Sequence, residues 1–186
     1  MPEWNTETAE WYATNYGNYP TNRLAVDHLE LMDHITIIDV GCGTGSALRY
    51  AANKFIAGTL IGIDPVPRMI EIAEELTENH SAFDRISFKV GVAEDLPIDD
   101  DSADLVFAFD SIDHWQDVEQ GLEEIQRILK SDGEVVLVKD NGVPGAKEAL
   151  NSLRKTLDSA GFDLTVQKEI NAEDMTFCLW ICQSTK

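Results

Sequence analysis

The chain has 186 residues, of which 34 are acidic and 14 are basic, so its formal net charge is −20. This length fits a single domain that is large enough to bury a hydrophobic core. A negative charge of this size repels phosphate backbones, so we expect no nucleic-acid partner. Apolar residues make up 44% of the chain, and no apolar run reaches the ~18 residues that a membrane helix needs. We therefore expect no membrane insertion.

Cysteine use and the first residues of the chain indicate its compartment. Cys42, Cys178 and Cys182 give an odd count, which favours reduced thiols over a disulfide framework. The first residues lack the basic start and the apolar core of a signal peptide. We therefore expect a cytoplasmic protein. The histidines outside the motifs described below are scattered rather than at metal-ligand spacing, so we assign no metal site.

Aromatic residues are concentrated at the start of the chain. Five of the 15 aromatic residues come at or before position 19, namely Trp4, Trp11, Tyr12, Tyr16 and Tyr19. We divide the single domain into an N-terminal helical and aromatic segment, residues 1–34, and a main part, residues 35–186. The N-terminal segment is predicted to cover a ligand site, because aromatic ring faces can contact a cation. Ordinary packing of an N-terminal helix is the alternative.

From residue 35 onward, strand-like and helix-like stretches alternate. The predicted strands are short and apolar without polar alternation, at 35–40, 60–63, 86–90, 105–109 and 135–138. Residues at helical spacing separate them, as from Leu48 to Phe55 and over 118–129. The second of these helices follows Asp117, a predicted N-cap with Gln120 as its capping-box partner. Strands of this kind, separated by helices, predict a parallel sheet that is covered on both faces.

The pattern changes after Gly161. Two strands, 162–166 and 177–181, follow each other without a helix between them, and residues 171–174 fit a hairpin turn. We therefore predict an α/β fold of the Rossmann-like, doubly wound type. Its mostly parallel, seven-stranded sheet would end in a C-terminal antiparallel hairpin.

Residues that suit a nucleoside stand at the ends of the first two predicted strands. Gly41, Gly43 and Gly45 leave a loop without side chains before a helix, so a ligand can lie against backbone N–H groups. Asp64 comes at the tip of the second strand, where a carboxylate can accept hydrogen bonds from both ribose hydroxyls. A tight strand–helix turn is the alternative explanation of the glycines. Ser46 stands where the dinucleotide fingerprint has glycine, which weakens the interpretation as an NAD site.

Five stretches carry a family resemblance. They are the glycine loop 39–45, the acidic motif 61–65 with Met69, the loop 91–97, the fourth-strand segment 104–115 and the helix–turn segment 125–134. In this order and spacing they resemble the class I S-adenosylmethionine-dependent methyltransferases. The small-molecule branch, which includes the ubiquinone-type methyltransferases, is the most similar. The resemblance covers about residues 35–140 in detail and the final hairpin in outline.

The resemblance implies which residues bind S-adenosylmethionine. From the methionine end to the adenine end they are Asp39, Gly41, Cys42, Gly43, Gly45 and Asp110, then Asp64 at the ribose, then Pro65, Met69, Ala93 and Glu94. Val92 departs from the family pattern, which often has an acidic residue at this position. The hydrogen bond to the adenine amino group is then lost, or it is supplied by Glu94 or Asp95.

The resemblance also places the methyl acceptor beside the turn that follows the fourth strand. His114 and Asp113 are the candidate catalytic residues there, with His114 as a base or as a substrate contact. A loop histidine without a role in the reaction is the alternative. Trp115 fits a pocket wall and ordinary packing equally well. The predicted substrate and cover residues are Trp11, Tyr12, Tyr16, Tyr19 and Trp115.

The function implied is in-line methyl transfer from S-adenosylmethionine to a small-molecule acceptor, which leaves S-adenosylhomocysteine and requires no metal. An acidic protein suits this cofactor, because the cofactor carries a net positive charge. An NAD(P)-dependent oxidoreductase and a non-catalytic S-adenosylmethionine-binding module are the alternatives. No large insertion follows the fifth predicted strand, so the substrate would be covered by residues 1–34 or by a second subunit of a homodimer.

Overall fold

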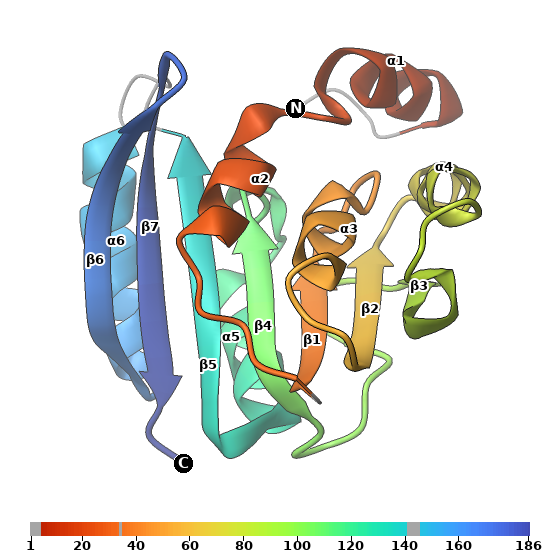
Figure 1. Cartoon of the computed structure of the whole chain (residues 1–186). Helices are drawn as coiled ribbons and strands as arrows, with labels where there is room; N and C mark the ends of the chain where they lie inside the picture. Colours follow the sequence, from red (N-terminus) through yellow and green to blue (C-terminus); the bar gives the residue numbers. More distant parts are fainter. Residues whose placement is uncertain (1–4, 34, 141–145) are drawn as a thin grey trace.

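The computed structural model describes residues 5–33, 35–140 and 146–186 and contains a seven-stranded sheet in the order β3-β2-β1-β4-β5-β7-β6 (Figure 1). Strands β1 to β5 are parallel, and β7 is antiparallel to both β5 and β6. The strands are β1 (Ile35–Val40), β2 (Gly58–Asp64), β3 (Ile86–Val90), β4 (Ala103–Phe109), β5 (Leu129–Asp140), β6 (Phe162–Ala172) and β7 (Met175–Ser184). The predicted fold class and its C-terminal antiparallel hairpin are confirmed.

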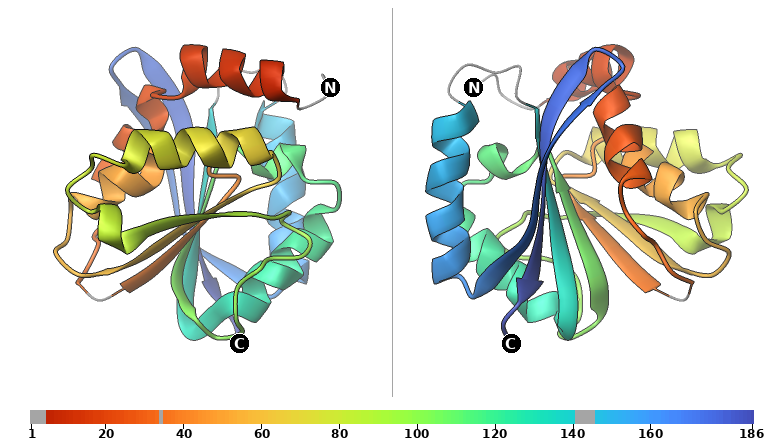
Figure 2. Two further views of the ribbon diagram at one scale, coloured as in Figure 1. Left: turned by 90° about the vertical axis from the view of Figure 1, so that its right-hand side faces the viewer. Right: turned by 60° about the vertical axis from the view of Figure 1, so that its left-hand side comes forward.

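Helices cover both faces of the sheet (Figure 2). On one face lie α2 (Pro20–Asp27), α3 (Ser46–Ala52) and α4 (Pro67–Thr77), and on the other lie α5 (Val118–Ile128) and α6 (Ala146–Ser159). Phe107 of β4 packs in the core that contains Leu48 of α3, whereas its neighbour Val106 packs in the core that contains Ile125 of α5. Successive residues of a strand point to opposite faces. Both faces are buried here, which explains why the strand sequences show no polar alternation.

Two helix ends differ from the prediction. β5 begins at Leu129, so α5 ends at Ile128 and the predicted helix 118–129 is one residue too long. Leu129 pairs with Ala103 of β4, and this sheet pairing takes precedence over helical spacing. α3 ends at Ala52, and Phe55, which the spacing assigned to that helix, lies buried in the turn before β2.

The C-terminal hairpin is longer than predicted. Its strands leave only Glu173 and Asp174 in the turn, both at positive φ, 51° and 64°. Two residues at positive φ form a turn whose twist matches the twist of the strands, so pairing continues to the tip. The predicted turn at 171–174 is therefore correctly placed but two residues too wide.

The start of α5 confirms the predicted N-cap, because the side chain of Asp117 accepts a hydrogen bond from the N–H of Gln120 at 3.1 Å. The predicted reciprocal bond of a capping box is not formed. The N–H of Asp117 donates to Oε1 of Glu94 at 2.9 Å, and the Gln120 amide donates to the carbonyl of Glu94. Glu94 thus takes the place of the capping-box partner.

The N-terminal segment forms two helices. α1 (Thr6–Tyr16) lies above the carboxyl ends of the parallel strands (Figure 1). Its Ala9 is fully buried against Val66 and Met69 at the start of α4, and Glu10 pairs with Arg68 at 3.2 Å. α2 packs on α3, where the Asn22 amide donates to Ser46 Oγ at 2.5 Å. Trp4 lies outside the described residues.

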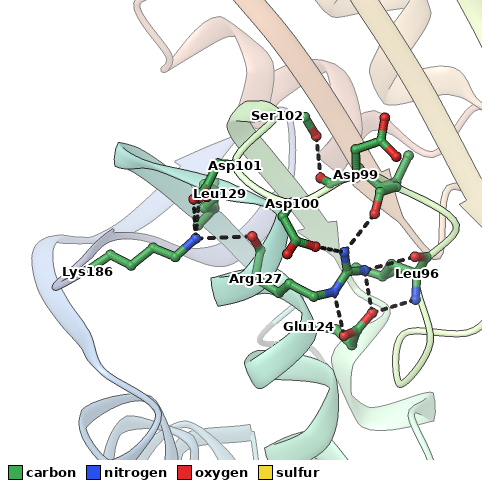
Figure 3. A network of polar contacts seen from close by, with 10 residues as sticks. Leu96, Asp99, Asp100, Asp101, Ser102, Glu124, Arg127, Leu129 and Lys186 are labelled. Atoms are coloured by element: carbon green, nitrogen blue, oxygen red, sulfur yellow. Dashed lines mark hydrogen bonds and ion pairs between the residues drawn. The ribbon is translucent and has the colours of Figure 1, made fainter.

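Arg127 of α5 is the centre of a polar network that holds the loop between β3 and β4 (Figure 3). Its guanidinium donates to the backbone carbonyls of Leu96 at 3.0 Å and Ile98 at 2.8 Å. It also pairs with Asp100 at 2.6 Å and with Glu124 at 2.7 Å. Glu124 in turn accepts the N–H of Leu96 at 2.8 Å, so the loop is held through both its donors and its acceptors.

We expect Arg127→Met to lower the free energy of unfolding by about 1–3 kcal/mol, because two backbone carbonyls and two carboxylates lose a charged donor. The matched control is Arg23→Met, since the ion pairs of Arg23 within the described part of the chain are with the exposed carboxylates of Asp27 and Glu173. Surface ion pairs contribute little, so the control should change stability much less. Urea unfolding measures both. Equal losses in the two variants would contradict the assignment.

Candidate functional site

A pocket lies at the carboxyl ends of β1, β2 and β4. α1 lies above the same ends of the strands (Figure 1). The strand order reverses between β1 and β4, and open parallel sheets bind ligands at such a switch point. We call this the main pocket. The predicted site residues that line it are Tyr12, Gly41, Gly43, Asp64, Pro65, Met69, Ala93, Glu94, Asp110, His114 and Trp115. A side pocket adjoins it and is lined by Tyr12, Tyr16, Tyr19 and Cys42, among others.

The glycine loop after β1 has a backbone that side chains would obstruct. Gly41, Gly43 and Gly45 have φ values of 78°, 51° and 73°, a region that favours glycine. A Cβ on Gly45 would lie 2.6 Å from the ring of Phe88, so Gly45 packs against β3 and lines neither pocket. A Cβ on Gly43 would meet only Tyr12, at 3.9 Å. The open side of the loop at Gly43 therefore faces the main pocket.

Asp64 ends β2 with a carboxylate that is part of the pocket wall, although the residue is only 7% exposed. Its Oδ2 accepts the N–H of Gly43 at 3.0 Å, and its Oδ1 accepts the N–H of Val66 at 2.9 Å. Burial raises the pKa of this carboxyl, and the two backbone hydrogen bonds act in the opposite direction. Each carboxylate oxygen has a second lone pair, so Asp64 can still accept hydroxyl donors from a ligand.

Asp39 lies at the end of β1 and lines neither pocket, with an exposed fraction of 2%. Burial raises its pKa to about 8, and the negative charge of Asp64 adds to the rise. Asp39 is therefore mostly protonated at neutral pH. The structure places this residue behind the glycine loop.

Asp110 follows β4 at a φ of 50° and lines both pockets. Its Oδ1 accepts the N–H of Asp140 at 2.7 Å. Burial raises its pKa to about 6, against the effects of that hydrogen bond and of Lys139.

Tyr12 lines the same two pockets, and burial together with Asp110 and Asp64 raises the pKa of its phenol. Tyr19 donates to Oδ2 of Asp140 at 3.3 Å. Tyr19 is thus bonded to a carboxylate beside the site, because the N–H of the same Asp140 donates to Asp110.

The loop after β3 forms another wall of the main pocket. Val92 lines it with an exposed fraction of 39%, and Asp95 does not line it. Oε1 of Glu94 accepts the N–H groups of Gln116 at 2.6 Å and of Asp117 at 2.9 Å. Glu94 therefore joins this wall to the start of α5, a role that is additional to the predicted one beside the adenine.

The turn after β4 contains a 3-10 helix, η2 (Ile112–His114). His114 is exposed and lines the main pocket. Asp113 points elsewhere, since it pairs with Lys139 and lines neither pocket. Trp115 both lines the main pocket and packs against α5, because a Cβ on Gly121 would lie 2.6 Å from its ring. Both interpretations of Trp115 therefore hold.

The predicted cover residues divide between the pockets and the surface. Tyr12 lines the main pocket, and Tyr16 and Tyr19 line the side pocket only. The Tyr16 ring lies 5.5 Å from that of Tyr12 and 5.8 Å from that of Tyr19. Trp11 lines neither pocket and is 57% exposed.

Burial raises the pKa of the Cys42 thiol well above its ordinary value, so the thiol is uncharged.

Several residues of the main pocket were not assigned from the sequence. They are Val40, Val66, Gly91, Phe109, Ser111 and Gln116. Ser111 has a clear local role, because its Oγ donates to the carbonyl of Val40 at 2.7 Å and so joins the ends of β4 and β1. Val40, Gly91, Phe109 and Ser111 lie inside the stretches that carry the family resemblance, and Val66 and Gln116 directly follow two of them. Position at or just after a strand end was therefore the signal that could have identified them.

Within residues 5–33, 35–140 and 146–186, no group of three or more His, Cys, Asp or Glu side chains is arranged to hold a metal ion. None of the helices in the same ranges combines the length and the apolar character that crossing a membrane requires.

The arrangement of the site is that of nucleotide-binding α/β proteins, with a glycine loop after the first strand and an acidic residue at the end of the second. Residues 38–137 match a family model described as a methyltransferase domain. The chain belongs to this methyltransferase domain family.

Two relatives are similar to between half and two thirds of this chain. Over 118 residues the chain is 33% identical to a ubiquinone/menaquinone biosynthesis C-methyltransferase of Citrifermentans bemidjiense, covering 63% of this chain and 50% of that protein. Over 103 residues it is 34% identical to a protein of Oryza sativa subsp. japonica named probable tocopherol O-methyltransferase, covering 55% and 28%. The chain thus spans half or less of the length of these relatives.

A solved structure is similar over nearly the whole chain. It is the complex between the Haloferax volcanii Trm112 methyltransferase activator and a candidate methyltransferase. One chain of that complex superposes with a TM-score of 0.83 at 24% identity, covering 99% of this chain and 98% of that one. At this identity the likeness shows a shared fold.

We expect Asp39→Asn to flatten the pH dependence of stability between about pH 5 and about pH 8. In that interval folded Asp39 holds a proton that the unfolded chain has released, because its pKa is about 8 when folded. The wild-type free energy of unfolding therefore falls as pH rises, by at most about 1.4 kcal/mol per pH unit from this group. The asparagine side chain has no such proton to lose. Relative to wild type, the free energy of unfolding of the variant should therefore be higher near pH 8 than near pH 5. Urea unfolding at several pH values measures the slope, with exposed Asp84→Asn as control. A slope equal to that of the wild type would contradict the prediction.

Proposed function

We propose that this chain transfers a methyl group from S-adenosylmethionine to a small-molecule acceptor. The observation that carries the proposal is the convergence of Gly43 and Asp64 on one pocket, to which the turn after β4 also brings His114. Membership of the methyltransferase domain family supports the same activity. So do the relatives, whose names specify C-methyl transfer in quinone biosynthesis and O-methyl transfer to tocopherol.

The residues present fit S-adenosylmethionine. Its ribose has two hydroxyls, which suit the free lone pairs of the buried Asp64 carboxylate. Its amino-acid end has an ammonium and a carboxylate, which suit Asp110 and the open backbone at Gly43. Met69 and Pro65 line the same pocket and offer apolar contacts to an adenine ring. Asp39 and Gly45 act from behind the loop, by holding the conformation that exposes Gly43.

When bound, S-adenosylmethionine supplies a methyl group on a positively charged sulfur atom, which a nucleophile takes by in-line displacement. Most of the contribution of the chain is then orientation of the reactants in a confined pocket. The carboxylates of Asp64 and Asp110 and the face of Tyr12 place negative potential beside a positive charge. His114 would accept the proton of an oxygen, nitrogen or carbon acceptor. Asp113, paired with Lys139, would position the turn that carries His114.

The N-terminal segment supports the proposal as a cover. α1 is held on α4 by Ala9 and by the pair between Glu10 and Arg68, at the rim of the main pocket. Tyr12 is the residue through which this helix reaches the pocket wall. We assign contact with ligands to Tyr12, Tyr16 and Tyr19, and none to exposed Trp11.

Calorimetric titration with S-adenosylmethionine, S-adenosylhomocysteine and NAD tests the proposal, together with turnover on a panel of small-molecule acceptors. Binding of the first two and not of NAD is expected. Binding of NAD alone would favour an oxidoreductase on the same sheet. Binding of S-adenosylmethionine without turnover of any acceptor would favour a non-catalytic module.

We expect Asp64→Ala to weaken S-adenosylhomocysteine binding by about 2–4 kcal/mol, because two charge-assisted hydrogen bonds to the ribose are lost and water replaces them in part. Calorimetry gives the dissociation constant, and a thermal melt shows whether the variant still folds. Exposed Asp84→Ala is the matched control. An unchanged dissociation constant in a folded Asp64→Ala variant would remove Asp64 from the ribose site.

We expect His114→Ala to lower turnover by about 100- to 10,000-fold, the usual contribution of a positioned base. Affinity for S-adenosylhomocysteine should change little, because His114 stands on the acceptor side. His28→Ala is the control, since the His28 ring bonds the Leu24 carbonyl at 2.8 Å and lines no part of the pockets. A His114 variant that keeps both its rate and its pH profile would leave orientation alone as the source of catalysis.

We also infer that an activator protein partners this chain. The support is the Haloferax volcanii complex, in which a chain of nearly the same extent and fold is described together with a methyltransferase activator. A cytoplasmic location, the absence of nucleic acid among the partners and a homodimer stay predictions.

A further inference from the structure

The walls of the two pockets are acidic and contain no fixed basic side chain, as far as the structure describes the chain. Their lining residues include Asp64, Glu94 and Asp110, and none of them is a lysine or an arginine. The amino-acid end of S-adenosylmethionine carries a carboxylate as well as an ammonium. A carboxylate that enters an acidic surrounding is repelled unless a positive charge lies close by.

Arg49 of α3 brings a positive charge to the rear of the glycine loop. Its Nη1 donates to the carbonyl of Thr44 at 2.7 Å and to Oγ1 of Thr77, the last residue of α4, at 3.2 Å. Thr44 is part of the glycine loop and lines the side pocket. A Cβ on Gly45 would lie 3.3 Å from the same nitrogen, so the guanidinium lies directly against the loop.

The charge of Arg49 is not neutralised by a carboxylate. Among residues 5–33, 35–140 and 146–186, no ion pair includes Arg49. Burial lowers the pKa of its guanidinium, which nevertheless stays charged at neutral pH, because arginine titrates only at very high pH. Lys139 also acts on the site, since it lowers the pKa of Asp110, but its ammonium is paired with Asp113. Arg49 therefore remains available to attract a ligand anion.

The positive charge reaches the wall of the side pocket. Arg49 lowers the pKa of the Cys42 thiol, although burial has the larger and opposite effect. Cys42 lines the side pocket together with Gly43 and Thr44. Arg49 is half-buried, so water screens its charge less than it screens a charge at the surface. Negative charge is therefore favoured at this stretch of the wall.

We propose that Arg49 is the positive partner of the carboxylate of S-adenosylmethionine, and that it acts through the glycine loop without touching the ligand. The inference rests on the cofactor of the proposed function and adds a residue that positions its amino-acid end. Asp110 would receive the ammonium, and the backbone at Gly43 and Thr44 would receive the carboxylate with Arg49 behind it. The two charges of the amino-acid end would then each face an opposite charge of the chain.

A purely structural role of Arg49 predicts a different result. Its hydrogen bonds also fasten the glycine loop to the end of α4, so their loss would disturb all ligands of the site alike. The two roles are separated by S-adenosyl-3-thiopropylamine, which is S-adenosylhomocysteine without its carboxylate. This ligand keeps the adenine, the ribose, the sulfur and the ammonium. The charge of Arg49 cannot attract it.

The test is calorimetric titration of the full chain with S-adenosylhomocysteine and with S-adenosyl-3-thiopropylamine. Arg49→Gln should weaken binding of S-adenosylhomocysteine by about 10-fold, the effect of one charge at moderate distance in a partly screened site. It should leave binding of the decarboxylated ligand unchanged or slightly tighter, because a positive charge that repels its ammonium is removed. Arg49→Lys keeps the charge and should recover most of the affinity for S-adenosylhomocysteine.

Arg85→Gln is the matched control. Arg85 likewise donates to backbone carbonyls, those of Ala52 at 2.9 Å and Phe55 at 3.2 Å, but these lie at the other end of α3. The control should leave the ratio of the two dissociation constants as it is in wild type. Urea unfolding verifies that each variant is folded, and Arg49→Met replaces Arg49→Gln if the glutamine variant is not.

Three results would overturn the proposal. They are equal weakening of both ligands by Arg49→Gln, unchanged affinity of that variant for S-adenosylhomocysteine, and an Arg49→Lys variant that binds this ligand no better than Arg49→Gln does. Each of them requires a wild type that binds S-adenosylhomocysteine, so each would leave the proposed function standing. A wild type that does not bind S-adenosylhomocysteine would instead overturn the proposed function, and this inference with it.

Discussion

A single buried carboxylate holds together two loops that the sequence keeps 23 residues apart. Asp64 accepts one hydrogen bond from the glycine loop, at Gly43, and one from Val66 at the start of α4. A carboxylate in this position is costly to bury, and these backbone donors offset part of the cost. Asp39, directly behind, is mostly neutral at pH 7, so the two acidic groups do not both carry a full charge at close range. Asp64 therefore forms its two backbone hydrogen bonds at the pocket wall beside a mostly neutral Asp39.

The opposite wall depends on a second set of polar contacts. Glu94 binds two N–H groups at the start of α5, and Arg127 near its end binds the carbonyls of Leu96 and Ile98. The loop between β3 and β4 is thus fixed to one helix at two points. A loop without regular secondary structure can form a defined wall in this way, because its backbone groups are satisfied by side chains of a rigid element.

The fold was predictable because both faces of the sheet are buried. This constraint makes strands such as β4 continuously apolar, and the pattern is visible in the sequence without knowledge of contacts. Gly43 and Asp64 were predictable for a related reason, since a nucleoside site needs those residue types directly after particular strands. Tyr12 was identified by the aromatic crowding, although the same crowding gave no means of separating it from exposed Trp11.

What escaped prediction involves side chains that meet across long stretches of sequence. Asp113 was interpreted as catalytic, and the structure pairs it with Lys139 on the next strand. Gly45 was assigned to the ligand, and the ring of Phe88 on β3 occupies the space beside it. Glu94 was assigned to the adenine, and it also caps α5. In each case the residue type was noticed correctly, and its partner came from an element whose position only the folded sheet defines.

The short link between α1 and α2 is attached to the glycine loop itself. The buried hydroxyl of Thr44 donates to the carbonyl of Gly17 at 2.7 Å, and Asn22 binds Ser46 at the start of α3. α1 is therefore attached at its C-terminal end to the backbone that would meet a ligand, while Ala9 and Glu10 attach the same helix to α4. The helix thereby connects the glycine loop after β1 with the start of the helix after β2.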